Sequence, residues 1–349
     1  MKSLSLSLVA QGKLKITERD IPKLSGDKSL VKLKDVGVCS SDIHRSFGGG
    51  AYFYPLVMGH EATGVVEKSS SSEFSKGQQV VIFPLKPCFK CKNCKKESFQ
   101  TCSNYGYYGS REDGAYQEYL IVNNWNLLKV PRKINSEDAA LTEPTAIMVH
   151  VMNILMEDLG KKKAMVVSGA IIGGGFLSMI LGKLLLFKGL TNFSIFDRND
   201  FKIKFAKIRN IYVKHSKELD KRNSLNAYDW VVEASGDPKS VKKSIEICKP
   251  GGLIILMSNI SSEVTIPADI FSSILRKEIT IKGSWNSSFS HIQKNDWKET
   301  IKLFKNGFKP SDFISHRVDL NEVPETLKRL YLHKTRKKQF QAIKALIKF

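Results

Sequence analysis

Residues 87–103 read PCFKCKNCKKESFQTCS, and the four cysteines in this stretch organise the chain around them. Cys88, Cys91, Cys94 and Cys102 follow the spacing C-x2-C-x2-C-x7-C. Four thiols this close in sequence can surround a tetrahedral ion without a folded core to bring them together. The stretch therefore predicts a structural zinc site, and we expect the lysines interleaved with the ligands to be solvated counter-charge.

Two other uses of clustered cysteines fit less well. Six cysteines in 349 residues are too few for a disulfide-built scaffold. A ferredoxin-type iron–sulfur run also opens with C-x2-C-x2-C, but its fourth cysteine follows after three residues and precedes a proline. Here the last gap is seven residues and no proline follows, so zinc is the preferred ion.

The length and composition predict an ordinary globular protein of about two domains. The chain has 349 residues, of which 42% are hydrophobic and 26% charged, and no uninterrupted apolar run reaches the length of a membrane helix. Residues 1–9 alternate serine and leucine, which predicts a strand rather than a signal peptide. We expect a cytoplasmic enzyme with no membrane partner.

The net charge of +21, from 55 lysines and arginines against 34 acids, gives a surface that attracts anions. The basic residues are spread along the chain, and no helix-turn-helix, RNA-binding or zinc-finger spacing is present, so no nucleic-acid partner is expected. A non-specific solvated surface and a phosphorylated substrate are both consistent with this charge.

Two loops before the cysteine stretch carry more residues that can bind metal. Residues 36–45 read VGVCSSDIHR and contain Cys39, while residues 55–66 read PLVMGHEATGVV and contain His60 and Glu61. Taken alone, such a cysteine and histidine are more often a buried thiol and a hydrogen-bonded core histidine than a metal site. The interpretation depends on the wider pattern.

That pattern, G-V-C-x-S-D-x-H, then G-H-E-x-x-G-x-V, then the four cysteines, resembles the zinc-dependent medium-chain dehydrogenases. Within this superfamily, five further stretches are most similar to the galactitol-1-phosphate and sorbitol dehydrogenase branch. They are residues 50–61, 83–88, 108–114, 141–144 and 274–285. The resemblance covers essentially the whole chain, and its specificity comes from the order and spacing of the stretches.

The resemblance implies an α/β plus β fold in two domains. A GroES-like β-barrel catalytic domain would comprise residues 1–148, with the zinc lobe, and the chain would return to it at 288–349. A Rossmann domain with a doubly wound parallel sheet would comprise residues 149–287, and the active site would lie in the cleft. The resemblance also implies a homo-oligomer, a dimer or a tetramer.

The resemblance also implies a second, catalytic zinc ion. Cys39 and His60 would be direct ligands, and Glu143 in the stretch LTEP would supply the third, leaving the open position that catalytic zinc requires. Glu61 matches a glutamate beside the metal, which ligates it directly or through exchange with water.

By the same resemblance, Ser41 takes a proton from the substrate hydroxyl and His44 passes it toward solvent. Two other readings stay open: Ser41 as the cap of a helix starting near Asp42, and His44 as a surface residue. Ser40 stands where most of the family has glycine, and a positive φ there would strain it.

From residue 164 the pattern predicts a βαβ unit that binds a dinucleotide. AMVVSGAIIGGGF (164–176) is an apolar strand, a small-residue turn and a helix start, and NFSIFD (192–197) is the next strand, ending in an acid. With Gly173 placed as the third glycine of G-x-G-x-x-G, Ser168 and Ala170 replace the first two. On this alignment the turn is degenerate and the affinity for pyrophosphate is reduced.

Asp197 is expected to hydrogen-bond the adenosine ribose and to favour NAD over NADP, although Arg198 beside it leaves the choice open. Two later turns, at 257–259 and 284–286, would face nicotinamide or form plain loops. The residues expected to contact the cofactor are Ala170, Ile172, Gly173, Asp197, Lys202, Ser258 and Ser284.

We therefore expect an enzyme that oxidises a secondary alcohol of a polyol or polyol phosphate to a ketose with NAD. One alternative is a ketose-phosphate reductase in surface-polymer synthesis. Another is a non-catalytic descendant that retains the structural zinc, which Ser40, Ser168 and Ala170 would support.

Overall fold

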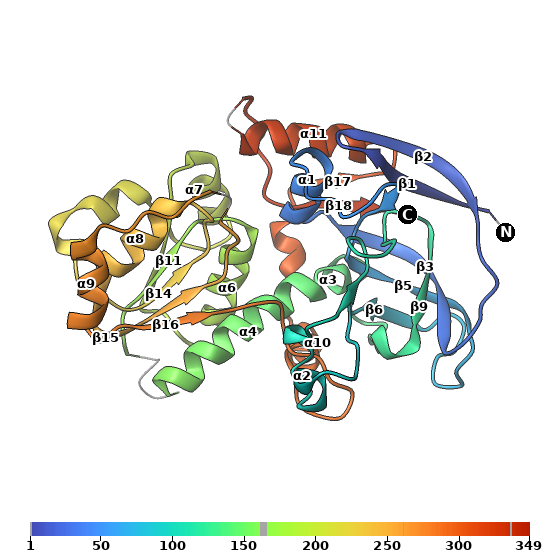
Figure 1. The fold of residues 1–349 in the computed structure, drawn as a ribbon, viewed down its shortest axis with the longest axis horizontal. Helices are drawn as coiled ribbons and strands as arrows, with labels where there is room; N and C mark the ends of the chain where they lie inside the picture. The colour runs from blue at the N-terminus through green and yellow to red at the C-terminus, as the bar shows by residue number, and fades with distance from the viewer. Residues whose placement is uncertain (1, 161–165, 261, 336) are drawn as a thin grey trace. The chain divides into compact units, whose positions relative to one another are not determined.

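The computed structural model describes residues 2–160, 166–260, 262–335 and 337–349 (Figure 1). Its internal contacts divide the chain into unit 1, residues 1–146 with 288–349, and unit 2, residues 147–287. Among the described residues, no helix is both long and apolar enough to cross a membrane. The α/β plus β fold class expected from the sequence is confirmed.

Unit 1 is built on a seven-stranded sheet with the order β10-β6-β5-β3-β18-β17, in which β9 also pairs with β3. β18, from the end of the chain, runs antiparallel to β3, with Ile347 opposite Val36. Both ends of the chain therefore build one sheet. The strands are β3 (Lys28–Gly37), β5 (Glu61–Ser69), β6 (Gln79–Ile82), β9 (Tyr119–Asn123), β10 (Leu127–Lys129), β17 (His316–Val318) and β18 (Ala345–Lys348).

A three-stranded sheet, in the order β2-β1-β4, supplies part of the same core. Its strands are β1 (Lys2–Ala10), β2 (Lys13–Asp20) and β4 (Leu56–Val57), and the pair β7 (Leu85–Lys86) and β8 (Gly106–Tyr107) frames the cysteine stretch. Leu6, Leu33, Val36 and Tyr116 are fully buried in one apolar cluster. Along β1 the serines are buried as well as Leu6 and Leu8, whereas Leu4 is exposed, so burial does not follow the serine–leucine alternation.

The helices of unit 1 are α1 (Ser40–Phe47), α2 (Lys92–Lys95), α3 (Ser136–Ala140), α10 (Asp296–Lys305) and α11 (Val323–Lys334), with 3-10 turns η1 (Phe99–Thr101), η2 (Asn124–Asn126) and η5 (Pro310–Phe313). α4 (Thr142–Leu159) begins in unit 1 and continues into unit 2. α3 and α4 are separate helices, because α3 ends at Ala140 with Leu141 as its C-cap. Asn135 caps the start of α3, accepting a hydrogen bond from the Asp138 N–H. Pro144 lies in the first turn of α4, where its missing N–H costs nothing.

Unit 2 is a six-stranded parallel sheet in the order β13-β12-β11-β14-β15-β16. Numbered within the unit, this is the order 3-2-1-4-5-6 of the Rossmann fold. The strands are β11 (Gly169–Ile172), β12 (Phe193–Asp197), β13 (Val213–His215), β14 (Tyr228–Glu233), β15 (Cys248–Leu256) and β16 (Thr280–Gly283). Buried Ala170, Phe196, Val231 and Ile254 belong to its core.

Helices flank this sheet in the chain order expected for βαβ units (Figure 1). They are α6 (Phe176–Phe187), α7 (Asp200–Lys207), α8 (Pro238–Ile247) and α9 (Ala268–Arg276), with 3-10 turns η3 (Ser216–Asp220) and η4 (Arg222–Ser224). The first strand was expected to begin at residue 164. Residues 164 and 165 lie outside the described residues, and β11 as described begins at Gly169.

One ion-pair network ties α3 to the strands that close the sheet of unit 1. Glu137 accepts hydrogen bonds from Arg317 Nε at 2.7 Å and from Lys348 Nζ at 3.0 Å. Hydrogen bonds from these two cations lower the pKa of Glu137 to about 2. A carboxylate with a lowered pKa stabilises the fold above its ordinary pKa of 4.5, and this contribution is lost as the pH falls from 4.5 toward 2.

Glu137→Gln is therefore expected to reduce the free energy of unfolding at pH 7 by about 1 kcal/mol, a small value because both cations are about half exposed. Urea unfolding at pH 7 and at pH 3.5 would measure this. The difference in free energy of unfolding between Glu137→Gln and wild type should be smaller at the lower pH. Glu325→Gln, which changes an exposed acid of α11, should have the same free energy of unfolding as wild type at both pH values. An equal difference in free energy of unfolding between Glu137→Gln and wild type at both pH values would contradict the lowered pKa of Glu137.

Candidate functional site

The four cysteines predicted to hold zinc come together in a small lobe between β7 and β8. Their ligand atoms all lie within 4.8 Å of one another. The Sγ atoms of Cys88 and Cys94 are 3.9 Å apart, as are those of Cys91 and Cys102. Tetrahedral Zn–S bonds of 2.3 Å place ligand sulfurs about 3.8 Å apart. The lobe therefore fits a tetrahedral zinc ion.

The protonation energetics of these thiols favour a bound cation. Backbone N–H groups of Cys94 and Ser103 lower the pKa of the Cys91 thiol to about 5. Burial raises the pKa of the Cys94 thiol to about 12, because a buried thiolate without a counter-charge is costly. A divalent ion would stabilise all four thiolates together.

An aromatic cluster anchors the lobe to the rest of unit 1. Trp125 contacts Phe89 and Phe99 of the lobe at ring-centroid distances of 5.0 and 5.2 Å. On its other side, Trp125 contacts Phe289 at 5.1 Å, which stacks on Phe83 at 4.2 Å. These aromatic residues lie far apart in the sequence, so their spacing did not predict that they form a cluster.

A second set of metal-competent side chains lies where β3 ends and β5 begins. Cys39, His60 and Glu61 offer ligand atoms that lie within 4.8 Å of one another. Cys39 is the N-cap of α1, with φ of −90°, and Ser40 begins the helix. Ser40 is not among the residues with positive φ, so the strain considered for it is absent.

Asp42, on the first turn of α1, contacts the residues around Cys39 and His60. Its carboxylate accepts hydrogen bonds from the Cys39 N–H at 3.0 Å, from Arg45 at 3.0 Å and from the Tyr116 hydroxyl at 2.9 Å. Burial raises the pKa of Asp42, but His60 and Arg45 outweigh it and bring the pKa to about 2. Asp42 is thus a fixed negative charge behind His60.

The charge around His60 also favours a cation. Its Nδ1 lies 3.5 Å from Asp42 Oδ1. Burial lowers the pKa of His60, but the neighbouring Asp42 and Cys39 raise it well above its ordinary value. The same surroundings that attract a proton to this imidazole would stabilise a divalent ion bound in its place.

Glu143 lies beside this set rather than within it. It is 4% exposed, and its Oε1 accepts a hydrogen bond from the Tyr107 hydroxyl at 3.3 Å. Burial raises its pKa to about 7, and the charges of His60, Glu61 and Lys344 all act on it. The Glu143 carboxylate is therefore close enough to interact electrostatically with His60 and Glu61, but it does not belong to the group formed by Cys39, His60 and Glu61.

Glu61 has its own partner. Lys344, on the segment before β18, is 5% exposed, forms an ion pair with Glu61 and donates a hydrogen bond to the Val38 carbonyl at 3.1 Å. A buried lysine is costly unless paired, so this contact fixes the Glu61 carboxylate near Cys39 and His60. The sequence did not point to Lys344.

Ser41 and His44 lie three residues apart on α1, and so on one face of that helix. Ser41 is the second residue of the helix and not its cap, because Cys39 takes that position. His44 is exposed, and its ring packs so closely on Gly48 and Gly50 that a Cβ on either glycine would lie within 2.6 Å of it. Glycine at these positions leaves room for the imidazole.

The small-residue turn after β11 lies later than the alignment on Gly173 as the third glycine placed it. Ser168 precedes the strand and donates to the Asp229 carboxylate at 2.8 Å, and Ala170 is fully buried inside the strand. The turn itself is Gly173 to Gly175, followed by α6. Placing Ser168 and Ala170 in this turn was wrong, because β11 continues to Ile172.

In the register that the structure gives, the motif is G-x-G-x-x-S, formed by Gly173, Gly175 and Ser178. Gly173 has φ of 102°, and a Cβ there would lie 2.8 Å from the Ser235 backbone. A Cβ on Gly175, the N-cap of α6, would meet nothing within 4 Å. Space before a helix N-terminus suits a phosphate. The motif therefore keeps both glycines of the turn, and only Ser178, inside α6, replaces a glycine.

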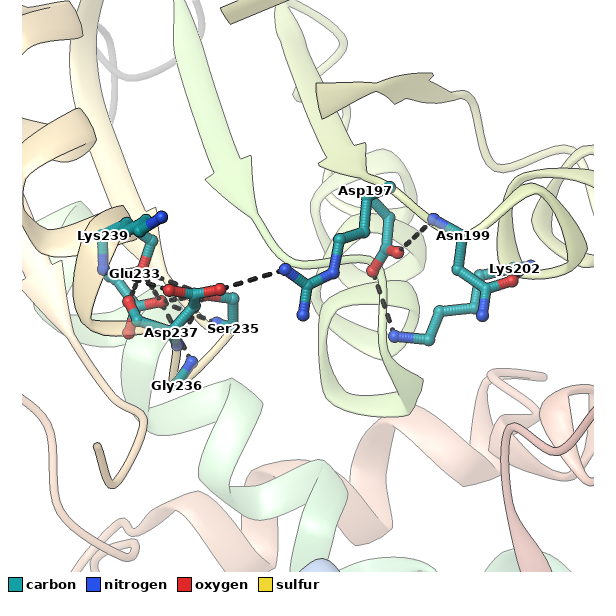
Figure 2. A network of polar contacts seen from close by, with 10 residues as sticks. Asp197, Asn199, Lys202, Glu233, Ser235, Gly236, Asp237 and Lys239 are labelled. Atoms are coloured by element: carbon teal, nitrogen blue, oxygen red, sulfur yellow. Dashed lines mark hydrogen bonds and ion pairs between the residues drawn. The ribbon is translucent and has the colours of Figure 1, made fainter. Parts of the chain in front are cut away.

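Asp197 ends β12 beside this turn (Figure 2). Its carboxylate accepts hydrogen bonds from the Gly174 N–H at 2.7 Å, the Asn199 N–H at 2.8 Å and Lys202 Nζ at 3.1 Å. The side chain is only 7% exposed. Asp197 and Lys202 are thus brought together at the strand end where the sequence placed them.

The remaining cofactor candidates lie at strand ends of the same sheet. Ser258 follows β15, and Ser284 follows β16 with its N–H bonded to the Leu256 carbonyl at 2.9 Å. The Ser284 hydroxyl is buried and, in the described part of the chain, has no hydrogen-bond partner. Ile172 lies at the end of β11 and is 6% exposed, which leaves it little surface for a ligand.

Two family comparisons cover nearly all of this architecture. Residues 25–132 match the alcohol dehydrogenase GroES-like domain, and residues 136–335 match the glucose dehydrogenase C-terminus. The chain belongs to the zinc-dependent medium-chain dehydrogenases. The expected family is confirmed, and both cysteine-containing sets could hold a metal ion.

The chain is similar to relatives whose names denote a sugar-alcohol phosphate or a ketose. The chain is 28% identical over 302 residues to galactitol 1-phosphate 5-dehydrogenase of Escherichia coli (strain K12), covering 84% of this chain and 86% of that protein. It is 26% identical over 327 residues to D-xylulose reductase A of Aspergillus oryzae, covering 87% of each. The crystal structure of galactitol-1-phosphate dehydrogenase from Escherichia coli superposes with a TM-score of 0.87 at 25% identity, covering 100% of both chains.

Proposed function

We propose that this protein transfers a hydride between NAD and a secondary alcohol of a polyol or polyol phosphate, giving a ketose. The observation that carries the proposal is the set of Cys39, His60 and Glu61 in one unit, together with a glycine turn and Asp197 on a Rossmann sheet in the other. The relatives named above, whose names denote polyol and ketose chemistry, support it.

We propose that Cys39, His60 and Glu143 hold the catalytic zinc, with Glu61 beside it. Glu61 belongs to the group of three in the structure, so it is the alternative third ligand, and Glu143 then lies next to the ion. Asp42 orients His60 and holds its charge. A zinc ion there would act as a Lewis acid that lowers the pKa of a substrate hydroxyl.

The proton released by the substrate needs a path to solvent, and α1 offers one. Ser41 and His44 lie on the same face of the helix that Cys39 caps, and His44 is exposed. In this proposal the Ser41 hydroxyl accepts the substrate proton while donating its own toward His44. An imidazole has one nitrogen that accepts a proton and one that releases it, which suits that role.

For the cofactor, we propose that the turn at Gly173 and Gly175 binds the pyrophosphate against the N-terminus of α6. Asp197 would accept hydrogen bonds from the adenosine ribose and repel a 2′-phosphate, which favours NAD. Lys202 neutralises part of the Asp197 charge, and the unpartnered Ser284 hydroxyl is available to the nicotinamide end. NAD supplies the hydride acceptor when bound.

The test is NADH formation by purified, zinc-replete protein with a matched panel of polyols and polyol phosphates, repeated with NADP. We expect turnover with at least one member and a preference for NAD. The ketose-phosphate reductase alternative predicts faster turnover in the reverse direction with NADPH. The non-catalytic alternative predicts silence in both directions, but the ordinary glycine turn removes most of its support.

We also propose that the protein is a homo-oligomer. β16 is an edge strand of the described sheet, with Ile281 at 41% and nearby Trp285 at 50% exposure. α9, which precedes it, has no buried residue. An edge strand with apolar neighbours can pair with the same strand of a second copy about a twofold axis.

Ile281→Asp is therefore expected to convert a dimer or tetramer to a smaller species, because it places a charge at the paired edge. Light scattering after size exclusion would measure the mass. Exposed Ile208, at 79% and on the segment after α7, gives the matched control Ile208→Asp, which should leave the mass unchanged. A monomeric wild type, or an unchanged mass for Ile281→Asp, would contradict the interface.

A further inference from the structure

Two aromatic rings hold Arg111 in a fixed position, and among the described residues it has no acidic partner. Its guanidinium carbon lies 4.7 Å from the ring centroid of Tyr52 and 4.5 Å from that of Tyr105. Contact with two rings restricts the guanidinium while its N–H edges stay available, and the residue is exposed.

The nearest acids in sequence are engaged elsewhere. Glu112 forms an ion pair with Lys86, and Asp113 pairs with Arg19 at 2.9 Å and accepts the Val57 N–H at 2.8 Å. Within the described ranges, no carboxylate lies at ion-pair distance from Arg111. An unpaired, pre-oriented guanidinium is a good receptor for a phosphate.

This receptor is connected to the candidate metal set through aromatic contacts. Tyr105 contacts Tyr107 at 6.3 Å between ring centroids, and Tyr107 contacts His60 at 5.7 Å. The Tyr107 hydroxyl also donates to Glu143 at 3.3 Å. A substrate whose hydroxyl lies at the metal set could extend along these rings toward Arg111.

We propose that Arg111 is the phosphate-binding residue of the substrate site, and that the substrate is a polyol phosphate rather than a free polyol. This rests on the proposed dehydrogenase function. The planar guanidinium presents two parallel N–H donors to two phosphate oxygens, which a lysine could not do. Tyr52 and Tyr105 keep it in place.

The experiment compares Arg111→Gln with wild type on galactitol and on galactitol 1-phosphate. A lost charged hydrogen bond lowers kcat/KM for the phosphorylated substrate about 10- to 100-fold, with no change for the free polyol. Arg111→Lys should recover part of the loss. Arg132→Gln, on another exposed arginine, is the control and should change neither.

Equal losses on both substrates, or none, would overturn the phosphate role. Binding of galactitol 1-phosphate to the zinc-loaded protein, measured by calorimetry, is independent of turnover. Weaker binding by Arg111→Gln than by Arg132→Gln supports the proposal, and equal binding overturns it. If wild type oxidises no polyol, the dehydrogenase proposal fails, while the calorimetry still decides the role of Arg111.

A second, independent observation concerns Arg198, which follows Asp197 at the end of β12. An arginine at this position is suited to a cofactor 2′-phosphate. Here its Nη1 donates to Asp237 Oδ2 at 3.1 Å (Figure 2). The Arg198 side chain is 61% exposed and that of Asp237 30%, so solvent can compete for the pair.

A chain of hydrogen bonds from the end of β14 fixes the position of Asp237. Glu233, fully buried at the end of β14, accepts hydrogen bonds from the Ser235 N–H at 2.8 Å and hydroxyl at 2.6 Å. The Ser235 hydroxyl in turn accepts the Asp237 N–H at 3.1 Å. Asp237 Oδ1 caps α8 by accepting the Lys239 N–H at 3.1 Å. Oδ2 is thereby aimed at Arg198.

We infer that Asp237 is a specificity-determining residue, which favours NAD by pairing with Arg198, the arginine next to Asp197 that could bind a 2′-phosphate. Release of Arg198 would let it contact that phosphate and offset the repulsion by Asp197. An exposed ion pair contributes at most about 1 kcal/mol, which corresponds to a change of about fivefold.

Asp237→Asn keeps the helix cap, because asparagine also caps, and removes the charge. We expect it to bind 2′,5′-ADP about fivefold more tightly than wild type and to bind 5′-ADP equally well. Adding Arg198→Gln should abolish the gain. Asp220→Asn, which removes a carboxylate paired with Lys243, is the control for loss of charge.

An unchanged ratio of the two affinities in Asp237→Asn would overturn the inference, as would a gain that persists without Arg198. Calorimetry of these fragments needs neither substrate nor zinc. If wild type binds neither fragment, the proposed cofactor site itself is wrong and the inference falls with it.

Discussion

Cys39→Ser should reduce turnover by about 10³-fold or more, because it removes a ligand of the proposed catalytic zinc. A Lewis acid contributes several kcal/mol of transition-state stabilisation, and each 1.4 kcal/mol is tenfold in rate. The fold should survive. Cys39 is the N-cap of α1, and serine is among the preferred residues at that position.

Metal content separates this effect from a general loss of structure. Elemental analysis should show two zinc ions per chain in wild type and one in Cys39→Ser, since the four-cysteine lobe is unaffected. Cys248→Ala, on a buried thiol of β15 outside both cysteine sets, should keep two ions and full turnover. Unchanged turnover in Cys39→Ser would refute the proposed mechanism.

The cysteine lobe and the order of motifs could be predicted because their information is local. Cys88, Cys91, Cys94 and Cys102 lie in one short stretch, and the structure brings their sulfurs together. Cys39, His60 and Glu61 were instead assigned through the family resemblance, and the pairing of β3 with β5 brings them together. A metal site whose ligands all lie in one short stretch can therefore be predicted from the sequence.

The register of the glycine motif in the dinucleotide turn could not be predicted from the sequence alone. Small residues occupy positions 168 to 170 and 173 to 175, so G-x-G-x-x-G can be aligned in more than one register. Only the end of β11 at Ile172, set by its pairing with β12 and β14, decides among them. Sequence periodicity does not fix the last residue of a four-residue strand.

Long-range partners were missed for a different reason. Lys344 bonds to Val38 across 306 positions and pairs with Glu61. Of the two rings that hold Arg111, Tyr105 is near in sequence but Tyr52 is distant. One signal was available: residues 342–349 read AIKALIKF, and a lysine among apolar residues is rarely buried unless an acid pairs with it. Nothing in the sequence named Glu61 as that partner.

The second large effect is expected in the four-cysteine lobe, where a bound zinc ion would take the place of a hydrophobic core. The lobe contains only the four-residue helix α2 and the turn η1, and of its apolar side chains Phe89 is 54% exposed. Structural zinc contributes on the order of 10 kcal/mol of apparent binding energy to isolated zinc-finger peptides, and that energy is folding energy.

Cys94→Ser should therefore release one zinc ion per chain and unfold the lobe, while the sheets of unit 1 keep their own core. Removal of Phe89 and Phe99 from Trp125 should shift the tryptophan fluorescence to longer wavelength, and limited proteolysis should cut within residues 87–103. Chelation of wild type should reproduce both changes, and Cys248→Ala should show neither. A Cys94→Ser protein that resists proteolysis at this stretch would mean that the aromatic contacts, rather than the metal, hold the lobe.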